Sequence, residues 1–191
     1  MRAERSSGGT PPAPDSMDFG RNYFELFGLP AAYALDRSLL DAAYRELQNT
    51  VHPDRFAAQP DAAQRVAMQW AAQANEAYQT LRHPVSRAAY LLKLQGIDAL
   101  DAGNTKMAPS FLMQQMEWRE AIDAARAEKR LEALDALTAD LRAAHGRTER
   151  QLTDLIDTAH DFKAAVELVR QLRFMDKLIA EVGDAYEELE G

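Results

Sequence analysis

The sequence predicts an all-α protein of two domains, a helical hairpin with short flanking helices followed by a three-helix bundle. Apolar residues recur at spacings of three and four along most of the 191 residues, and no stretch shows the period-two alternation of a strand. The periodicity weakens between residues 96 and 108, where two glycines and an asparagine stand, so we expect a linker there. The predicted domains therefore span residues 18–95 and 109–191.

Composition argues against several classes of protein. The formal net charge of -8 argues against a nucleic-acid-binding surface and against binding to an anionic membrane. The absence of cysteine excludes disulfides, thiolate zinc sites and cysteine-ligated iron–sulfur clusters. No apolar run is long enough to span a bilayer. We expect a cytoplasmic monomer without a cofactor, a nucleic-acid partner or a membrane partner.

The N-terminal residues 1–17 are expected to form a disordered tail. They are polar and rich in Gly, Pro and Ser, a composition that cannot bury enough surface to fold. Met17 is a candidate start of the functional chain. Glu4 and the lack of an Arg-rich amphipathic pattern argue against a mitochondrial transit peptide.

The first domain is expected to open with a short helical turn near Tyr23–Phe27, which Gly28 closes. Asp36 is a candidate N-cap for a helix from about Arg37 to Thr50, because its carboxylate can accept from the first free amides. The apolar stripe of this helix consists of Leu40, Ala43, Tyr44, Leu47 and Val51.

A longer helix is predicted from about Pro60 to Arg82, and Pro84 then opens a short helix that stops at Gly96. Two amphipathic helices joined by a loop pack as an antiparallel hairpin. The apolar stripe of the longer helix consists of Val66, Trp70, Ala74, Ala77, Tyr78 and Leu81.

The loop of this hairpin carries His52-Pro53-Asp54. Pro53 lacks an N–H and disfavours the α region for His52, so the helix should stop here and the polar side chains should point outward. His52 and Asp54 suit a general base with its orienting acid, or a metal site with His83. However, no nucleophile lies nearby in sequence and the spacing matches no standard ligand pattern. We therefore favour a surface that a protein partner reads.

The second domain is predicted to hold three helices, at about Ser110–Glu128, Leu131–Thr158 and Asp161–Glu190, with Gly146 as a candidate bend in the middle one. The charged run at 126–130 is expected to be a solvated helix face. His145 and His160 are expected to be solvated helix residues.

The first of these helices carries apolar residues on two sides. Its core stripe consists of Phe111, Gln115, Trp118, Ile122 and Ala125. The opposite side holds three apolar side chains and two carboxylates: Leu112, Met113, Met116, Glu117 and Glu120. In the last helix, Phe174 likewise lies off the stripe, which consists of Leu168, Leu172, Met175, Ile179, Val182 and Tyr186. Two explanations account for these off-stripe apolar residues. They form an exposed patch that binds a partner, or the helices are buried on two sides, by each other and by the first domain.

Several segments resemble a known family. The aromatic turn, His52-Pro53-Asp54 between two helices, and the segment Asn75 to Leu81 resemble a J domain. Further segments are similar to HscB, the J-type co-chaperone family of iron–sulfur cluster assembly: Tyr23 to Pro30, Leu81-Arg82-His83-Pro84, Ala89-Tyr90-Leu91-Leu92, Phe111-Leu112-Met113 and Leu172 to Leu178. The resemblance runs from about Asp18 to the C-terminus.

The resemblance implies an adaptor without catalytic activity of its own. Its J domain would stimulate the ATPase of a DnaK-type chaperone, HscA, through His52, Pro53 and Asp54, with Arg45 and Arg55 as basic contacts. Its C-terminal three-helix bundle would bind the cluster scaffold IscU. The scaffold-binding positions of the family fall on Leu112, Met113, Met116, Glu117, Glu120 and Phe174, which favours the exposed patch.

The sequence departs from the family pattern at several positions. Asn49, Thr50 and Val51 stand where many J domains carry lysines, so the electrostatic part of the chaperone contact is expected to be weak. Ala124 replaces a frequent acidic residue of the scaffold-binding surface. The cysteines of the zinc module in eukaryotic relatives are absent, which favours a bacterial-type protein. A J-domain adaptor for a different client is the alternative.

Overall fold

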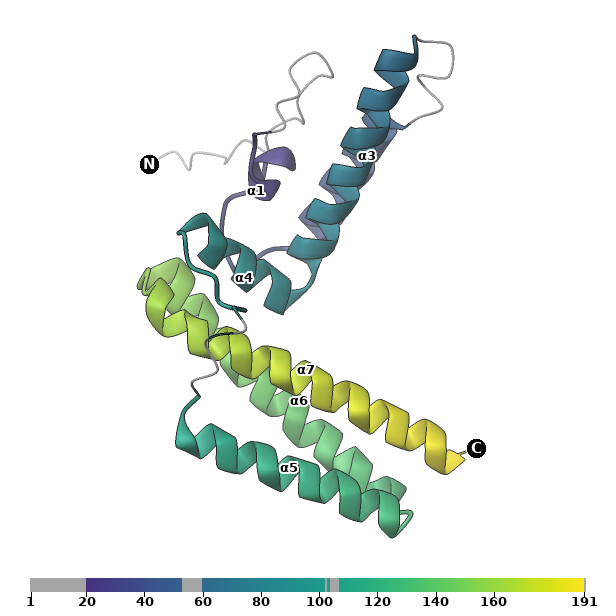
Figure 1. Ribbon diagram of the computed structural model, residues 1–191, viewed down its shortest axis with the longest axis vertical. Coiled ribbons are helices and arrows are strands. Elements are labelled where there is room, and N and C mark those ends of the chain that lie inside the picture. Colours follow the sequence, from purple (N-terminus) through teal and green to yellow (C-terminus); the bar gives the residue numbers. More distant parts are fainter. Residues whose placement is uncertain (1–19, 53–59, 102, 104–106, 191) are drawn as a thin grey trace, which may run out of the picture. The chain divides into compact units, whose positions relative to one another are not determined.

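The computed structural model describes residues 20–52, 60–101, 103 and 107–190. Within these ranges all regular secondary structure is helical (Figure 1), as the sequence predicts. The chain divides into two compact units, residues 1–87 and 88–191, and the division falls inside the helix α4 (Pro84–Leu94). No helix in the described part of the chain is long and apolar enough to cross a membrane.

The first unit opens with α1 (Tyr23–Leu26), a single turn that its cap stabilises. The Asn22 side chain accepts from the backbone N–H groups of Phe24 and Glu25 at 3.0 Å each. The Glu25 carboxylate accepts in return from the Asn22 N–H at 3.0 Å, which completes a capping box. Gly28 follows at a φ of 63°, a left-handed conformation that glycine adopts without steric cost.

The helices α2 (Arg37–Val51) and α3 (Asp61–Arg82) form the predicted hairpin. Asp36 caps α2 as expected and accepts from the Ser38 N–H at 2.8 Å. The chains are antiparallel, because Asp41 pairs with Tyr78 while Gln48, two turns later, pairs with Asn75. The buried residues of the first unit are Phe24, Leu26, Phe27, Tyr33, Leu40, Leu47, Val51, Ala67, Trp70, Ala74, Ala77, Leu81 and Val85.

The predicted stripe of α3 is wrong at its first position. Val66 is 46% exposed, and Ala67 is buried in its place. The buried positions therefore follow the order 67, 70, 74, 77 and 81. A stripe built on spacings of three and four is ambiguous by one residue at its ends, since 3.6 residues make one turn.

Five polar and aromatic side chains join α2 to α3 on the outside of the hairpin. We call Asp41, Tyr44, Gln48, Asn75 and Tyr78 the hairpin clasp. Asn75 accepts from the Tyr44 hydroxyl at 2.5 Å and from the Gln48 amide at 2.8 Å. Tyr78 donates to Asp41 at 2.8 Å, and its ring stacks on Tyr44 with centroids 4.1 Å apart. The polar tips of this face therefore pair with one another.

The short helix α4 begins at Pro84 and is followed by Gly96, at a φ of 74°. Both ends agree with the prediction, because proline fits the first turn of a helix and glycine fits a left-handed position just past its end. Ala88, Leu91 and Leu92 are its buried residues beyond the division at residue 87.

The second unit packs α5 (Pro109–Ala127), α6 (Leu131–Thr153) and α7 (Phe162–Glu190) side by side (Figure 1). The middle helix continues into a π-helical turn, η3 (Asp154–Thr158), so helical structure extends to Thr158 as predicted. Gly146 does not interrupt α6. The core consists of Trp118, Ile122, Ala125, Leu134, Leu137, Leu141, Ala144, Leu152, Ile156, Ala165, Val169, Leu172, Met175, Leu178, Val182 and Ala185.

Three expectations for the second unit are wrong. Of the charged run 126–130, residues 126 and 127 end α5 and Glu128 and Lys129 form a turn before α6, with Lys129 at a φ of 52°, so the run is not a continuous helix face. His160 is exposed but lies between helices, also at a φ of 52°. His145 is not solvated, because its side chain is only 15% exposed between the carboxylates of Glu149 and Asp176.

Candidate partner-binding surfaces

His52 caps the C-terminal end of α2 and is exposed. Its φ of -58° and ψ of 127° are extended, as expected for a residue that precedes proline. Arg45 is exposed two turns earlier on the same side of α2, because seven residues make nearly two full turns. Pro53, Asp54 and Arg55 lie outside the described residues. The structure thus places one loop residue and one basic residue of the expected chaperone-binding set.

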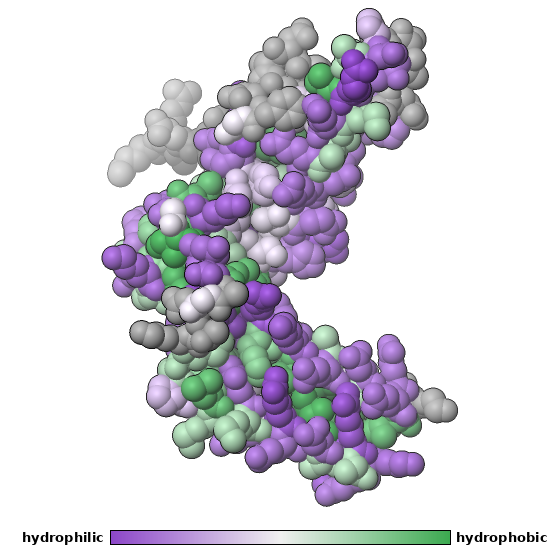
Figure 2. All heavy atoms as spheres, viewed as in Figure 1, coloured by the Kyte–Doolittle hydropathy of each residue, from purple (hydrophilic) through white to green (hydrophobic). Residues whose placement is uncertain are grey.

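The back of α5 carries the apolar side chains that the sequence singled out. Leu112 is 45% exposed, Met113 is 65% exposed and Met116 is 62% exposed. Glu117 and Glu120 are exposed on the same side of the helix. We call these five residues the α5 patch. Neither α6 nor α7 covers it, and Figure 2 shows apolar side chains gathered near the N-terminal half of α5.

Phe174 of α7 is half-buried where α7 meets α5. Its ring packs edge-to-face on Phe111, with centroids 6.1 Å apart. The guanidinium of Arg119 lies 5.3 Å from the Phe174 ring centroid, in cation–π geometry. Sequence reasoning missed Arg119, although its spacing of three from Met116 places it on the same side of α5. The half-buried position of Phe174 therefore matches neither a fully exposed patch residue nor a core residue.

His145 joins α6 to α7. Its Nε2 lies 3.0 Å from the Asp176 carboxylate, and its Nδ1 lies 3.6 Å from Glu149. The hydrogen bond to Asp176 and the nearby negative charge of Glu149 raise the pKa of His145, although burial opposes this. Asp176 lies 31 positions from His145, so no local sequence pattern reveals the pair.

The metal interpretation of the loop gains no support. His83 is exposed at the C-terminal end of α3, and Asp54 lies outside the described residues. In the part of the chain that the structure describes, no three carboxylate, imidazole or thiol groups are close enough to hold a metal ion.

Comparison with known proteins decides the family. Residues 107–183 match the model of the HSCB C-terminal oligomerisation domain. A co-chaperone HscB homolog from Burkholderia multivorans is 54% identical over 169 residues, which cover 88% of this chain and 96% of that protein. The chain belongs to the HscB family of co-chaperones. The resemblance seen in the sequence is thereby confirmed, and with it the role of a J-domain co-chaperone of the kind that serves iron–sulfur cluster assembly.

Solved structures of HscB proteins have the same fold. HscB from Vibrio cholerae is 40% identical, with a TM-score of 0.79 over 88% of this chain and 99% of that chain. Human HscB is 27% identical, with a TM-score of 0.82 over 90% of this chain and 83% of that chain. The all-α fold of a J domain followed by a C-terminal helical bundle is therefore confirmed.

Proposed function

We propose that this HscB protein binds the scaffold IscU through the α5 patch and Phe174, delivers it to the DnaK-type chaperone HscA, and stimulates the ATPase of HscA through His52, Pro53 and Asp54. The exposed apolar side chains on the back of α5 carry this proposal. Scattered exposed apolar residues are normal on a surface, but a cluster rimmed by carboxylates is typical of a protein-binding site.

The composition of the α5 patch suits a protein partner. Unbranched methionine side chains adapt their shape, and burial of a Leu or Met side chain contributes about 1.5–3 kcal/mol. Glu117 and Glu120 at the rim add charge selection, which favours a partner with a basic surface. Phe174, held between Phe111 and Arg119, supplies a fixed aromatic anchor.

The placement of His52 suits the chaperone contact. An exposed imidazole at the end of α2, with Arg45 on the same side, presents donors and positive charge together. Arg45 and Arg55 would attract an acidic surface of the chaperone, and long-range attraction of this kind raises association rates. In this proposal, residues 1–17 would be a tail and residues 18–95 the J domain. Residues 96–108 would be the linker, and residues 109–191 the scaffold-binding domain.

The first experiment tests the loop. The chain should accelerate ATP turnover by HscA, and His52→Gln should abolish this acceleration because the imidazole is lost from the presented loop. The helix content, measured by circular dichroism, should stay unchanged. Unaltered stimulation by the variant would overturn the assignment of the loop.

The second experiment tests the α5 patch. The double substitution Leu112→Ala with Phe174→Ala should weaken IscU binding by tenfold or more, since anchor residues of this kind each contribute at least ~1 kcal/mol. Leu131→Ala is the matched control, because Leu131 is a 39% exposed apolar residue at the start of α6, outside the patch. Comparable losses in both variants would contradict the proposal. A large loss of thermal stability in the double variant would support two-sided burial.

A further inference from the structure

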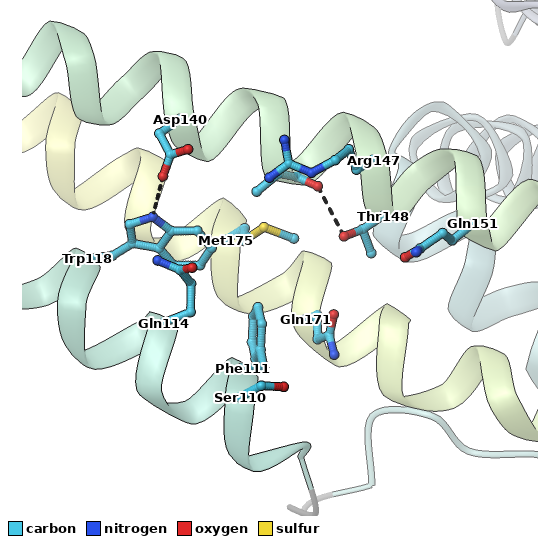
Figure 3. Close-up of a pocket in the computed structure, with 11 residues that line it drawn as sticks. Ser110, Phe111, Gln114, Trp118, Asp140, Arg147, Thr148, Gln151, Gln171 and Met175 are labelled. Atoms are coloured by element: carbon cyan, nitrogen blue, oxygen red, sulfur yellow. Dashed lines mark hydrogen bonds between the residues drawn. The ribbon is translucent and has the colours of Figure 1, made fainter.

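A groove runs along the junction of the three helices in the second unit, on the side of α5 away from the α5 patch. We call it the seam groove. Its volume is about 360 Å³, within the range of small-ligand and peptide sites. Residues of α5 and α6 form its walls and residues of α7 form its floor (Figure 3). The lining includes Ser110, Phe111, Gln114, Trp118, Asp140, Arg147, Thr148, Gln151, Gln171 and Met175.

One end of the seam groove is closed by a hydrogen bond between its walls. The indole N–H of Trp118 donates to the Asp140 carboxylate at 2.9 Å (Figure 3). The apolar surface that a ligand can reach is the half-buried Phe111 ring, because Met175 is 1% exposed and Trp118, on which Phe111 packs edge-to-face with centroids 6.1 Å apart, is 4% exposed. An apolar side chain of a ligand can therefore pack on the accessible side of the Phe111 ring.

Several polar groups around this floor are available to a ligand. Among the described residues, the side chains of Arg147, Gln151 and Ser110 have no hydrogen-bond or ion-pair partner. The Gln114 and Gln171 side chains donate through nitrogen to Glu117 and Glu167, which leaves their carbonyl oxygens to accept. The lining thus offers one cation, amide groups and a hydroxyl, and its carboxylate, Asp140, already accepts from the Trp118 N–H.

We propose that the seam groove binds a short extended peptide segment that places a carboxylate on Arg147 and an apolar side chain over Phe111. Amide groups match the alternating donors and acceptors of a peptide backbone. A phosphate group would leave the amides and the Phe111 ring unused, and a purely apolar ligand would bury the polar rim without partners. An acidic, partly apolar peptide satisfies both sets of groups.

We assign the peptide segment to the scaffold protein that covers the α5 patch. This assignment rests on the proposed function. The patch and the seam groove lie on two sides of the same helix. Phe111 lines the groove and packs on Phe174, which we assign to the scaffold-binding surface together with the α5 patch. A scaffold bound at the patch needs only a short extended segment to pass around the start of α5 into the groove.

A pair of labelled peptides tests the site on the full chain without any scaffold. The probe is an acetylated, amidated hexapeptide of alternating Leu and Asp, and its twin carries Asn in place of Asp. Fluorescence anisotropy should show saturable binding of the Asp peptide and about fivefold weaker binding of the Asn peptide, the factor expected from one exposed ion pair. The absence of saturable binding would overturn the groove and leave the proposed function untouched.

A matched pair of arginine variants locates the bound peptide. Arg147→Gln should weaken binding of the Asp peptide to the affinity of the Asn peptide. Arg150→Gln should have no effect, because Arg150 is exposed one turn away on α6 and does not line the groove. Leu112→Ala should also leave peptide binding unchanged. Equal losses in the two arginine variants would refute the site, whereas retained peptide binding without IscU binding would refute the proposed function alone.

Discussion

The hairpin clasp and the α5 patch both lie on the outside of a helix pair. They differ in whether their non-core side chains have partners within the protein. In the clasp, every aromatic ring has a stacked neighbour and every polar tip a hydrogen-bond partner within the first unit. In the patch, three apolar side chains project from α5 and neither α6 nor α7 covers them.

This difference distinguishes residues that stabilise the fold from residues that remain available to bind a partner. The groups of the clasp satisfy one another, so they offer few interactions to a partner and fix α2 against α3. The apolar surface of the patch stays in water, and a partner gains free energy when it covers that surface. Partner binding is therefore expected at the patch and at His52, not at the clasp.

The largest expected effect is on the free energy of unfolding, in a comparison of a core leucine with a leucine of the α5 patch. Leu141→Ala should lower the free energy of unfolding by about 2–5 kcal/mol, because Leu141 is 0% exposed and its loss leaves a cavity. Leu112→Ala should change it by less than about 0.5 kcal/mol, the usual limit for surface substitutions. Urea denaturation of both variants measures the pair. Equal destabilisation would mean that Leu112 belongs to the core.

A smaller effect is expected in the hairpin clasp. Asn75→Ala removes the acceptor for both Tyr44 and Gln48, and should cost about 1 kcal/mol of unfolding free energy, a typical net value for hydrogen bonds that water can partly replace. Gln79→Ala is the control on the exposed side of α3. If the two variants were equally stable, the clasp would not hold the hairpin.

The smallest effect concerns pH and the junction between α6 and α7. Because the folded-state pKa of His145 is raised, its contribution to stability is fully present below the unfolded pKa of about 6.5 and is lost as pH rises through the folded pKa. The melting temperature should therefore fall across this window, and His145→Gln should flatten that part of the profile. A profile unchanged by the substitution would show that the pair with Asp176 is not formed in solution.

Local chemistry explains which parts of the fold the sequence predicts. The Asp36 cap, the left-handed Gly28 and Gly96, and Pro84 at a helix start all depend on neighbours within a few residues. The same holds for the back of α5, because helix geometry alone separates Leu112 from Trp118. Family resemblance then supplied roles that these patterns leave open.

The parts that the sequence did not predict depend on contacts between distant segments. The acidic partner of His145 on α7 and the position of Arg119 over Phe174 arise only when α5 and α6 pack on α7. The seam groove likewise needs residues from three helices. Val66 was misplaced because one residue of rotation at a helix end changes which side chain is buried.

Within the second unit, a buried charge on α7 holds the segment that follows α4. Arg170 of α7 is 8% exposed, and its Nε donates to the carbonyl of Ala99 at 2.8 Å. Ala99 itself is 1% exposed. A fragment cut at Pro109 would lose this carbonyl and leave a guanidinium at the protein surface, beside apolar atoms that Ala99 no longer shields. The smallest piece of the bundle that resists proteolysis should therefore begin before Ala99, well upstream of its first long helix.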